Sequence, residues 1–267
     1  MPAGPARRPL VSGNWKMHHD HAEALHLVRD LGLRLSPEDT ELVDVSVHPP
    51  FTDLRTVGTV IEGEALPLAL GAQHCYHLDR GAFTGEVSPQ MLARLGTSYV
   101  LVGHSERRRL FGMDDATVAA TVRAVAAHAM TPICCVGETE DERDAGHTER
   151  VLETQLRAAL DRLGPDQVGA MVLAYEPIWA IGTGRAATPV DAEDACGFAR
   201  QVVGTLVGED AANTIRIQYG GSASADNAFE LVAEPDVDGL LVGGASLAAG
   251  SFLDTLRQVV ACYRAER

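Results

Sequence analysis

Short runs of apolar residues recur along the chain, and longer segments with helical spacing separate them. Several of the runs are rich in valine and isoleucine, and most lack alternation between apolar and polar positions. This pattern is typical of strands that are covered on both faces. It predicts eight strands, at residues 10–12, 43–47, 68–72, 99–102, 132–136, 170–174, 214–218 and 239–242.

The segments between the runs predict amphipathic helices. Asp20 is a residue type that caps helices, and after it Leu25, Val28 and Leu31 share one helical face. The same spacing predicts further helices at residues 116–129, 149–163, 191–207, 225–232 and 252–263.

Repeated strand-then-helix units over 267 residues favour a closed, eight-stranded parallel (β/α)8 TIM barrel. An open doubly wound sheet is the alternative, but its GxGxxG fingerprint is missing after the first strand. Neither a linker nor a low-complexity tract divides the chain. We therefore expect residues 10–267 to form a single catalytic domain and residues 1–9 to form a loose tail.

Composition narrows the class of protein. Hydrophobic residues make up 46% and charged residues 22% of the chain, which is ordinary for a globular protein. The net charge of −15 argues against nucleic acid or an anionic membrane as the main partner. Five cysteines without CxxC spacing predict reduced thiols and a cytoplasmic location. Cys134 and Cys135 are adjacent, so they are expected on opposite faces of one strand.

Polar residues follow three of the predicted strands at the end where barrel chemistry gathers. Asn14 and Lys16 lie two residues apart after the first strand, and together they can hold a phosphate or an oxyanion. His104 follows the fourth strand, where a helix N-terminus, capped by Ser105, disfavours protonation of the imidazole. Glu176 ends the sixth strand among apolar neighbours, and desolvation there makes a carboxylate a stronger base.

Two glycine pairs follow the last two predicted strands, at residues 220–221 and 243–244. Glycine lets backbone N–H groups approach an anion closely, so the pairs predict a phosphate site at adjacent strand ends. Residues 180–187 mix apolar side chains with glycine after the sixth strand, which predicts a lid over the ligand.

Six segments resemble the motifs of the triosephosphate isomerase family, and they occur in that family's order. They are GNWKM at residues 13–17, GAFTGE at 81–86, GHSERR at 103–108, AYEPIWAIGTG at 174–184, YGGS at 219–222 and LVGGAS at 241–246. The likeness extends over essentially everything from Leu10 onward. It implies an aldose–ketose isomerase that interconverts dihydroxyacetone phosphate and glyceraldehyde 3-phosphate through an enediolate.

The resemblance also implies a role for each catalytic residue. Glu176 would be the base, and neutral His104 the electrophile, as is known for that family. Lys16 and Asn14 would stabilise the developing negative charge. The phosphate would be held by backbone N–H groups of Gly182, Ser222, Gly243 and Gly244. The implied mechanism requires no metal and no organic cofactor.

Supporting roles follow from the same resemblance. Glu106 is expected to orient Lys16, which would have a positive φ, and Ser105 would hold Glu176 before the lid closes. The Tyr219 hydroxyl and Ser222 would fasten the far end of the closed lid near Ala187 and Gly184. Apart from the resemblance, the acidic stretch at residues 138–143 suggests a cation site, but a solvated helix face is the commoner reading, and Glu138 could instead brace the lid through Trp179.

The family is dimeric, so we expect a homodimer in which Thr84 touches Asn14 and His104 of the partner subunit. The loop that contains Thr84, residues 73–86, departs from the family pattern at His74. The loop after the first strand departs from it at His18. The cluster HHDH at residues 18–21 suggests a metal site, but it lacks the ordered spacing of zinc ligands and lies where helix-capping residues are expected.

Two other functions fit parts of the pattern. The same proton-transfer residues would serve a paralogue that acts on a longer ketose phosphate, such as a tetrulose phosphate. A non-catalytic barrel that binds a partner is a third reading, but it has no need for Lys16, His104 and Glu176 together.

Overall fold

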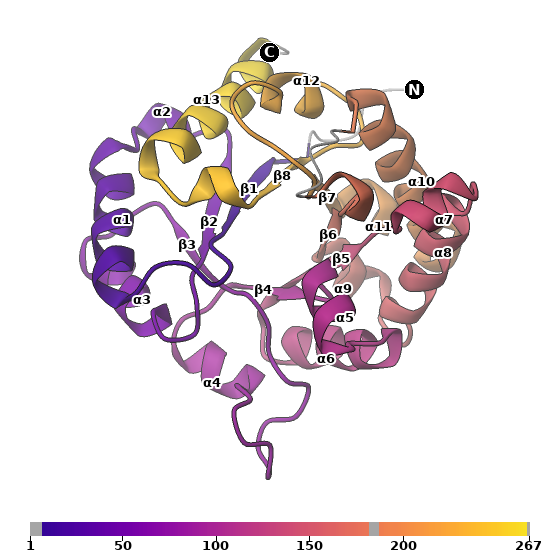
Figure 1. Cartoon of the computed structure of the whole chain (residues 1–267), viewed down its shortest axis with the longest axis horizontal. Helices are drawn as coiled ribbons and strands as arrows, with labels where there is room; N and C mark the ends of the chain where they lie inside the picture. Colours follow the sequence, from indigo (N-terminus) through magenta and orange to yellow (C-terminus); the bar gives the residue numbers. More distant parts are fainter. Residues whose placement is uncertain (1–6, 182–186, 266–267) are drawn as a thin grey trace.

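Eight parallel strands close into a barrel with helices on its outside (Figure 1), in a computed structural model that describes residues 7–181 and 187–265. Each strand pairs with its neighbours in the sequence, and the first pairs with the second and the last, which closes the barrel. The predicted TIM barrel is confirmed. The strands are β1 (Leu10–Asn14), β2 (Asp44–His48), β3 (Ala69–Ala72), β4 (Tyr99–Val102), β5 (Thr131–Val136), β6 (Val172–Tyr175), β7 (Arg216–Tyr219) and β8 (Gly239–Val242).

All eight predicted runs contain a strand, but the predictions for β6 and β7 began two residues too early. A short helix precedes each of these strands, since α9 (Pro165–Gly169) ends just before Ala170 and α11 (Glu209–Thr214) ends at Thr214. A proline in the first turn of α9 favours the helix start, and an apolar run alone does not distinguish a helix end from a strand.

The remaining helices surround the barrel. The longer ones are α1 (His21–Arg34), α3 (Leu54–Gly63), α6 (Asp115–Ala127), α8 (Thr148–Ala159), α10 (Pro189–Val207) and α13 (Ala249–Ala265). The shorter ones are α2 (Pro37–Thr40), α4 (Pro89–Arg94), α5 (Ser105–Phe111), α7 (Glu140–Asp144) and α12 (Ala228–Val232), with 3-10 turns η1 (Ile178–Ala180) and η2 (Gly244–Ser246). None of the helices in the described ranges is long and apolar enough to cross a membrane.

Helix α1 illustrates how local sequence sets an element. Asp20 accepts hydrogen bonds from two N–H groups of the first turn, and the Glu23 carboxylate accepts the Asp20 N–H at 3.0 Å, so the predicted cap is confirmed. The buried face differs slightly from the predicted one. It consists of Ala24, Leu27, Val28 and Leu31, whereas Leu25 is only half-buried.

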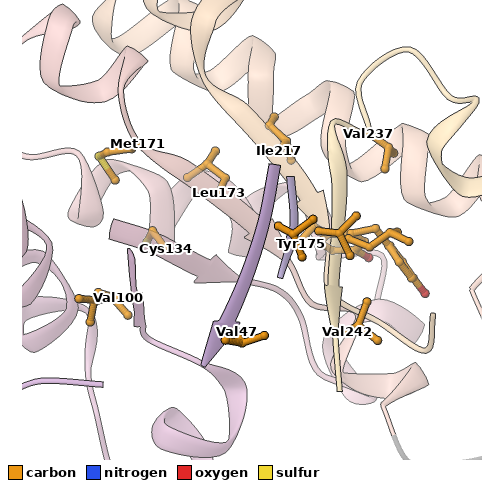
Figure 2. Close-up of a cluster of buried hydrophobic side chains, with 14 of the residues drawn as sticks. Val47, Val100, Cys134, Met171, Leu173, Tyr175, Ile217, Val237 and Val242 are labelled. Atoms are coloured by element: carbon orange, nitrogen blue, oxygen red, sulfur yellow. The ribbon is translucent and has the colours of Figure 1, made fainter. Parts of the chain in front are cut away.

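The apolar core has two layers. The outer layer lies between strands and helices, and Figure 2 shows part of it, with Cys134, Leu173 and Ile217 on neighbouring strands. The inner layer fills the barrel and includes Ile133, Cys135 and Val172 together with residues of three other strands. Cys134 and Cys135 thus face opposite sides of β5, as predicted.

The barrel interior also contains a buried polar network. Gln218 Nε2 donates to Ser12 Oγ at 2.9 Å, and Ser46 Oγ donates to the same hydroxyl at 2.9 Å. His48 lies beside Ser46, with Nε2 at 3.1 Å from its hydroxyl, and Nδ1 lies 3.2 Å from the carbonyl oxygen of Ala72. The network cross-links strands from opposite sides of the barrel beneath the carboxyl ends of the strands.

Two arginines just before β1 attach the start of the described chain to the barrel. Arg7 Nε donates to Asp238 at 2.6 Å. Arg8 pairs with Asp44 and donates to the carbonyl oxygens of Thr40 and Glu41, both at 2.7 Å. These contacts tie the last residues of the expected tail to the amino-terminal face of the barrel, and residues 1–6 lie outside the described part of the chain.

Candidate active site

The carboxyl ends of the strands surround a cavity of about 370 Å³. It is lined by the side chains that sequence reasoning selected, Asn14, Lys16, His104 and Glu176, which reach it from three different strands. It is also lined by three of the four residues expected at the phosphate, namely Ser222, Gly243 and Gly244. The fourth, Gly182, lies outside the described residues.

Glu176 follows β6 and is 2% exposed. Its Oε2 accepts the Ser105 N–H at 2.8 Å, so Ser105 holds the carboxylate through its backbone. Oε1 lies 2.9 Å from His104 Nε2, yet it has no well-aligned hydrogen-bond donor within residues 7–181 and 187–265. A buried carboxylate oxygen without an aligned donor can accept a proton from a ligand in the cavity.

His104 follows β4 and is itself the N-cap of α5, a position that sequence reasoning gave to Ser105. The imidazole caps the helix because its Nδ1 accepts the second N–H of the helix, that of Glu106, at 3.2 Å. Burial lowers the pKa of His104, but the neighbouring Glu176 carboxylate raises it above its ordinary value. Acceptance of the Glu106 N–H by Nδ1 opposes a second proton on the ring and leaves Nε2 as the donor.

Lys16 has a positive φ of 52°, as the resemblance implied. Its backbone is held on both sides, because Asn14 Oδ1 accepts the Lys16 N–H at 3.0 Å and Gln73 Nε2 donates to the Lys16 carbonyl at 2.7 Å. Its ammonium donates to Glu106 at 2.8 Å, which confirms that Glu106 orients it. Although burial raises the pKa of Glu106, Lys16 holds it below its usual value.

The glycines after β8 lie beside the ammonium of Lys16. A Cβ added at Gly243 would lie 3.5 Å from Lys16 Cε and 4.0 Å from Nζ, whereas a Cβ at Gly244 would meet nothing within 4 Å. The backbone here is therefore open to a ligand next to a cation. This arrangement suits a phosphate bound by N–H groups.

Comparisons with known proteins agree with the geometry. A family model described as triosephosphate isomerase matches residues 9–259. The chain belongs to the triosephosphate isomerase family. It is similar to the triosephosphate isomerase of Roseiflexus castenholzii, with 53% identity over 247 residues that cover 92% of this chain and 96% of the relative. The corresponding protein of Mycobacterium bovis is 48% identical over 257 residues, which cover 96% and 98%.

Trp179, which directly precedes the expected lid at residues 180–187, is held by several contacts in this triosephosphate isomerase family member. Glu138 Oε1 accepts hydrogen bonds from the Trp179 indole at 2.9 Å and from the Tyr175 hydroxyl at 3.0 Å, so the expected contact between Glu138 and Trp179 is confirmed. Arg143 lies over the Trp179 ring at 4.2 Å from its centroid. Residues 182–186, including Gly184 and most of the expected lid, lie outside the described residues.

The histidine cluster after β1 serves the helix and the core. Asp20 caps α1, and the His19 ring contacts the Trp15 ring edge-on with centroids 5.4 Å apart. Within the described ranges, no group of three or more His, Cys, Asp or Glu side chains is disposed to bind a metal ion.

Sequence reasoning missed Gln73, which bridges two strand ends. Its Nε2 donates both to the Lys16 carbonyl and to the His48 carbonyl, at 2.7 and 2.9 Å. The only signal was a polar residue directly after β3. An amide that satisfies a strained backbone has no distinctive spacing in the sequence.

Proposed function

We propose that this chain interconverts dihydroxyacetone phosphate and glyceraldehyde 3-phosphate by proton transfer through an enediolate. The observation that carries the proposal is the meeting of a carboxylate, an imidazole and an ammonium, from Glu176, His104 and Lys16, in one cavity that also contains the glycines after β8. The triosephosphate isomerase family supplies the reaction class, and the cavity supplies the groups that this reaction requires.

In the proposed first step, Glu176 removes a proton from the hydroxyl-bearing carbon next to the substrate carbonyl. The electron pair of that C–H bond forms the carbon–carbon double bond of the enediolate, and negative charge moves to the carbonyl oxygen. His104 donates from Nε2 to that oxygen, and the Lys16 ammonium and the Asn14 amide stabilise the charge. A positioned base contributes roughly 10²–10⁴ in rate.

In the second step, His104 transfers a proton between the two oxygens of the enediolate, and Glu176 returns its proton to the neighbouring carbon. The aldehyde forms and the base regains its charge, so no proton is consumed. The backbone N–H groups of Ser222, Gly243 and Gly244 hold the phosphate throughout. Closure of the lid, fastened by the Tyr219 hydroxyl, would keep water away from the enediolate. That hydroxyl is buried and has no partner within the described residues.

Steady-state kinetics of the purified protein test the proposal. Glyceraldehyde 3-phosphate and a tetrulose phosphate are supplied in parallel coupled assays. We expect saturable turnover of the triose and little or none of the longer sugar. Preferential turnover of the tetrulose phosphate would indicate the paralogous activity, and absence of both would indicate a binding protein.

We also propose a homodimer in which each subunit completes the neighbour's site. The loop between β3 and α4 projects from the barrel (Figure 1), and it exposes Thr84 and 39% of Phe83. A second cavity of about 200 Å³ lies beside Lys16 and is lined by Met17 and Phe111, which are 94% and 64% exposed. The projecting loop of a second copy would cover these apolar side chains and bring Thr84 to Asn14 and His104 of the partner subunit.

Sedimentation at decreasing concentration tests the homodimer. We expect a dimer of the wild-type chain. Thr84→Arg should weaken the dimer, because a long charged side chain would enter the partner's cavity. A wild-type protein that sediments as a monomer at every concentration would contradict the assignment.

The expected compartment and pathway complete the proposal. The cysteines of the chain are free and buried, and burial raises the pKa of the Cys134 thiol to about 11, so these thiols are unreactive. This supports a reducing, cytoplasmic setting, where the reaction would serve glycolysis and gluconeogenesis. Fractionation of cells that express the chain, followed by isomerase assays of each fraction, tests this placement.

A further inference from the structure

The backbone of β5 continues beside the base after its last strand residue. The Glu176 N–H donates to the Val136 carbonyl at 2.8 Å, and the Ile178 N–H donates to the Glu138 carbonyl at 3.1 Å. Gly137 lies between these two contacts. A Cβ at Gly137 would overlap the carbonyl oxygen of Glu176 and would lie 2.7 Å from its carbonyl carbon. The main chain of the base therefore rests directly on Gly137, and a residue with a side chain would displace it.

Gln155 supplies the hydrogen bonds that a neighbouring strand would have given to Gly137. The last residue of β4 pairs with Cys134, so beyond that point β5 has lost its partner on one edge. There the Gly137 N–H donates to Gln155 Oε1 at 2.8 Å, and Gln155 Nε2 donates to the Gly137 carbonyl at 3.1 Å. The side-chain amide of Gln155, which comes from α8 outside the barrel, thus pairs with both backbone groups of one residue.

We propose that Gln155 is a positioning residue for the base and acts through the backbone of Gly137. It does not line the cavity, and the glycine lies between it and Glu176. The proposal rests on the proposed function, in which Glu176 takes the proton. Without the amide pair, the end of β5 would gain freedom, and the carboxylate would spend less time at the substrate carbon. Misplacement of a catalytic group by about 1 Å can reduce rate about 100-fold.

The chain offers a matched control in Gln167. This residue also accepts a glycine N–H through Oε1, from Gly164 at 3.1 Å, but it does so in the first turn of α9 and does not line the active-site cavity. Removal of either amide leaves a glycine N–H without its side-chain acceptor. Only removal of Gln155 is expected to disturb the base.

The experiment compares Gln155→Met and Gln155→Glu with Gln167→Met. Q155E retains an acceptor for the Gly137 N–H but places a carboxylate oxygen against its carbonyl. Kinetic constants for the triose, competitive inhibition by inorganic phosphate and the melting temperature are measured for each protein. For both Gln155 variants we expect kcat to fall about 10-fold or more, within the range that misplacement allows. KM and the phosphate inhibition constant should stay within about twofold of wild type, because the phosphate site is separate from the base.

A purely structural role would give a different result. In that case the kcat of folded Gln155→Met would equal that of wild type, or would fall no further than that of Gln167→Met, and either outcome overturns the positioning role. A rise in KM with unchanged kcat would also overturn it. If Glu176→Gln abolishes turnover while Gln155→Met retains it, the base assignment stands and only the positioning role fails. A wild-type chain without isomerase turnover overturns both.

Discussion

The two ends of the barrel differ in how completely their buried charged groups are hydrogen-bonded. At the carboxyl end, Lys16 has a positive φ, and one oxygen of the buried Glu176 carboxylate lacks an aligned donor among the described residues. At the amino end, Arg200 donates to the carboxylates of Asp236 and Asp238 and also to three backbone carbonyls, at 2.7, 2.8 and 3.3 Å. The Glu176 carboxylate therefore leaves hydrogen-bonding capacity open, whereas the Arg200 guanidinium is satisfied.

The difference separates function from stability on a single sheet. An open polar group at a buried position reduces stability by about 1–3 kcal/mol, and a ligand that completes it can offset this cost. The ion pairs of Arg200 at the opposite face connect α10 to the starts of the strands. The comparison predicts that substitutions at the carboxyl end change turnover, whereas those at the amino end change the free energy of unfolding.

The largest effect is expected from Glu176→Gln, which removes the base but retains the shape of the side chain. We expect kcat to fall roughly 10³–10⁴-fold with a small change in KM, since a positioned base contributes up to about 10⁴ in rate. Steady-state kinetics in both directions measure this. The control is Glu193→Gln, which alters a half-buried carboxylate that accepts the Asp236 N–H at 3.0 Å. Full activity of E176Q would show that another group is the base.

The next effect is expected at the amino end, from Arg200→Met. This variant removes the cation but leaves Asp236 and Asp238 in a largely buried position, where loss of one partner of an ion pair reduces stability by about 3 kcal/mol or more. Arg7 still pairs with Asp238, which limits the loss. Urea unfolding measures the change. The kcat of the folded variant should equal that of wild type, and a drop in kcat without a loss of stability would contradict the division between the two ends.

His48 lies at the end of β2, between the two regions, and it should make the free energy of unfolding depend on pH. Burial lowers its pKa to about 4, from an ordinary value near 6.5. Between these values the unfolded chain binds a proton that the folded chain excludes, so stability is present above about pH 6.5 and is lost as pH falls toward 4. The total is about 3 kcal/mol.

The measurement is the free energy of unfolding at several pH values. His48→Gln should reduce the slope of the unfolding free energy against pH between pH 6.5 and 4. The same substitution at exposed His18 should leave that slope as in wild type. An unchanged slope in H48Q would show that His48 is protonated in the folded state or that other groups dominate. His74, whose pKa burial and Arg107 also lower to about 4, would retain part of the slope in either variant.

The sequence was most informative where chemistry and periodicity coincide. Apolar runs predicted every strand of the barrel, and polar residues at or just beyond the ends of β1, β4 and β6 predicted the groups that meet in the cavity. Parallel strands in a barrel end at one rim, so position along the chain translates directly into position in space.

The contacts that hold those groups were less accessible. Ser105 was expected to cap α5, but the neighbouring His104 does so, because which of two adjacent side chains reaches a helix N–H depends on backbone angles. Gln155 pairs with Gly137 across 18 residues through a side-chain amide, and no sequence period encodes such a pairing. Local chemistry was therefore predictable, whereas side-chain contacts between distant segments were not.

The smallest effect is expected from Arg8→Gln, at the same end as Arg200. Arg8 pairs with Asp44 and donates to carbonyl oxygens at the end of α2, but 46% of its side chain is exposed. Solvent screens such a pair, and Asp44 keeps a second partner in Arg216 at 2.9 Å. We expect the free energy of unfolding to fall by about 1 kcal/mol or less, with kcat unchanged.

Urea unfolding of Arg8→Gln beside Arg200→Met, in low and high salt, checks this order. The two arginines lie on the same face of the barrel, so a difference between their losses of stability reflects how deeply each ion pair is buried and not where it lies. Added salt should diminish the small effect of R8Q and leave most of that of R200M. Equal losses for the two variants would mean that the amino-terminal face as a whole, rather than the buried ion pairs within it, stabilises the barrel.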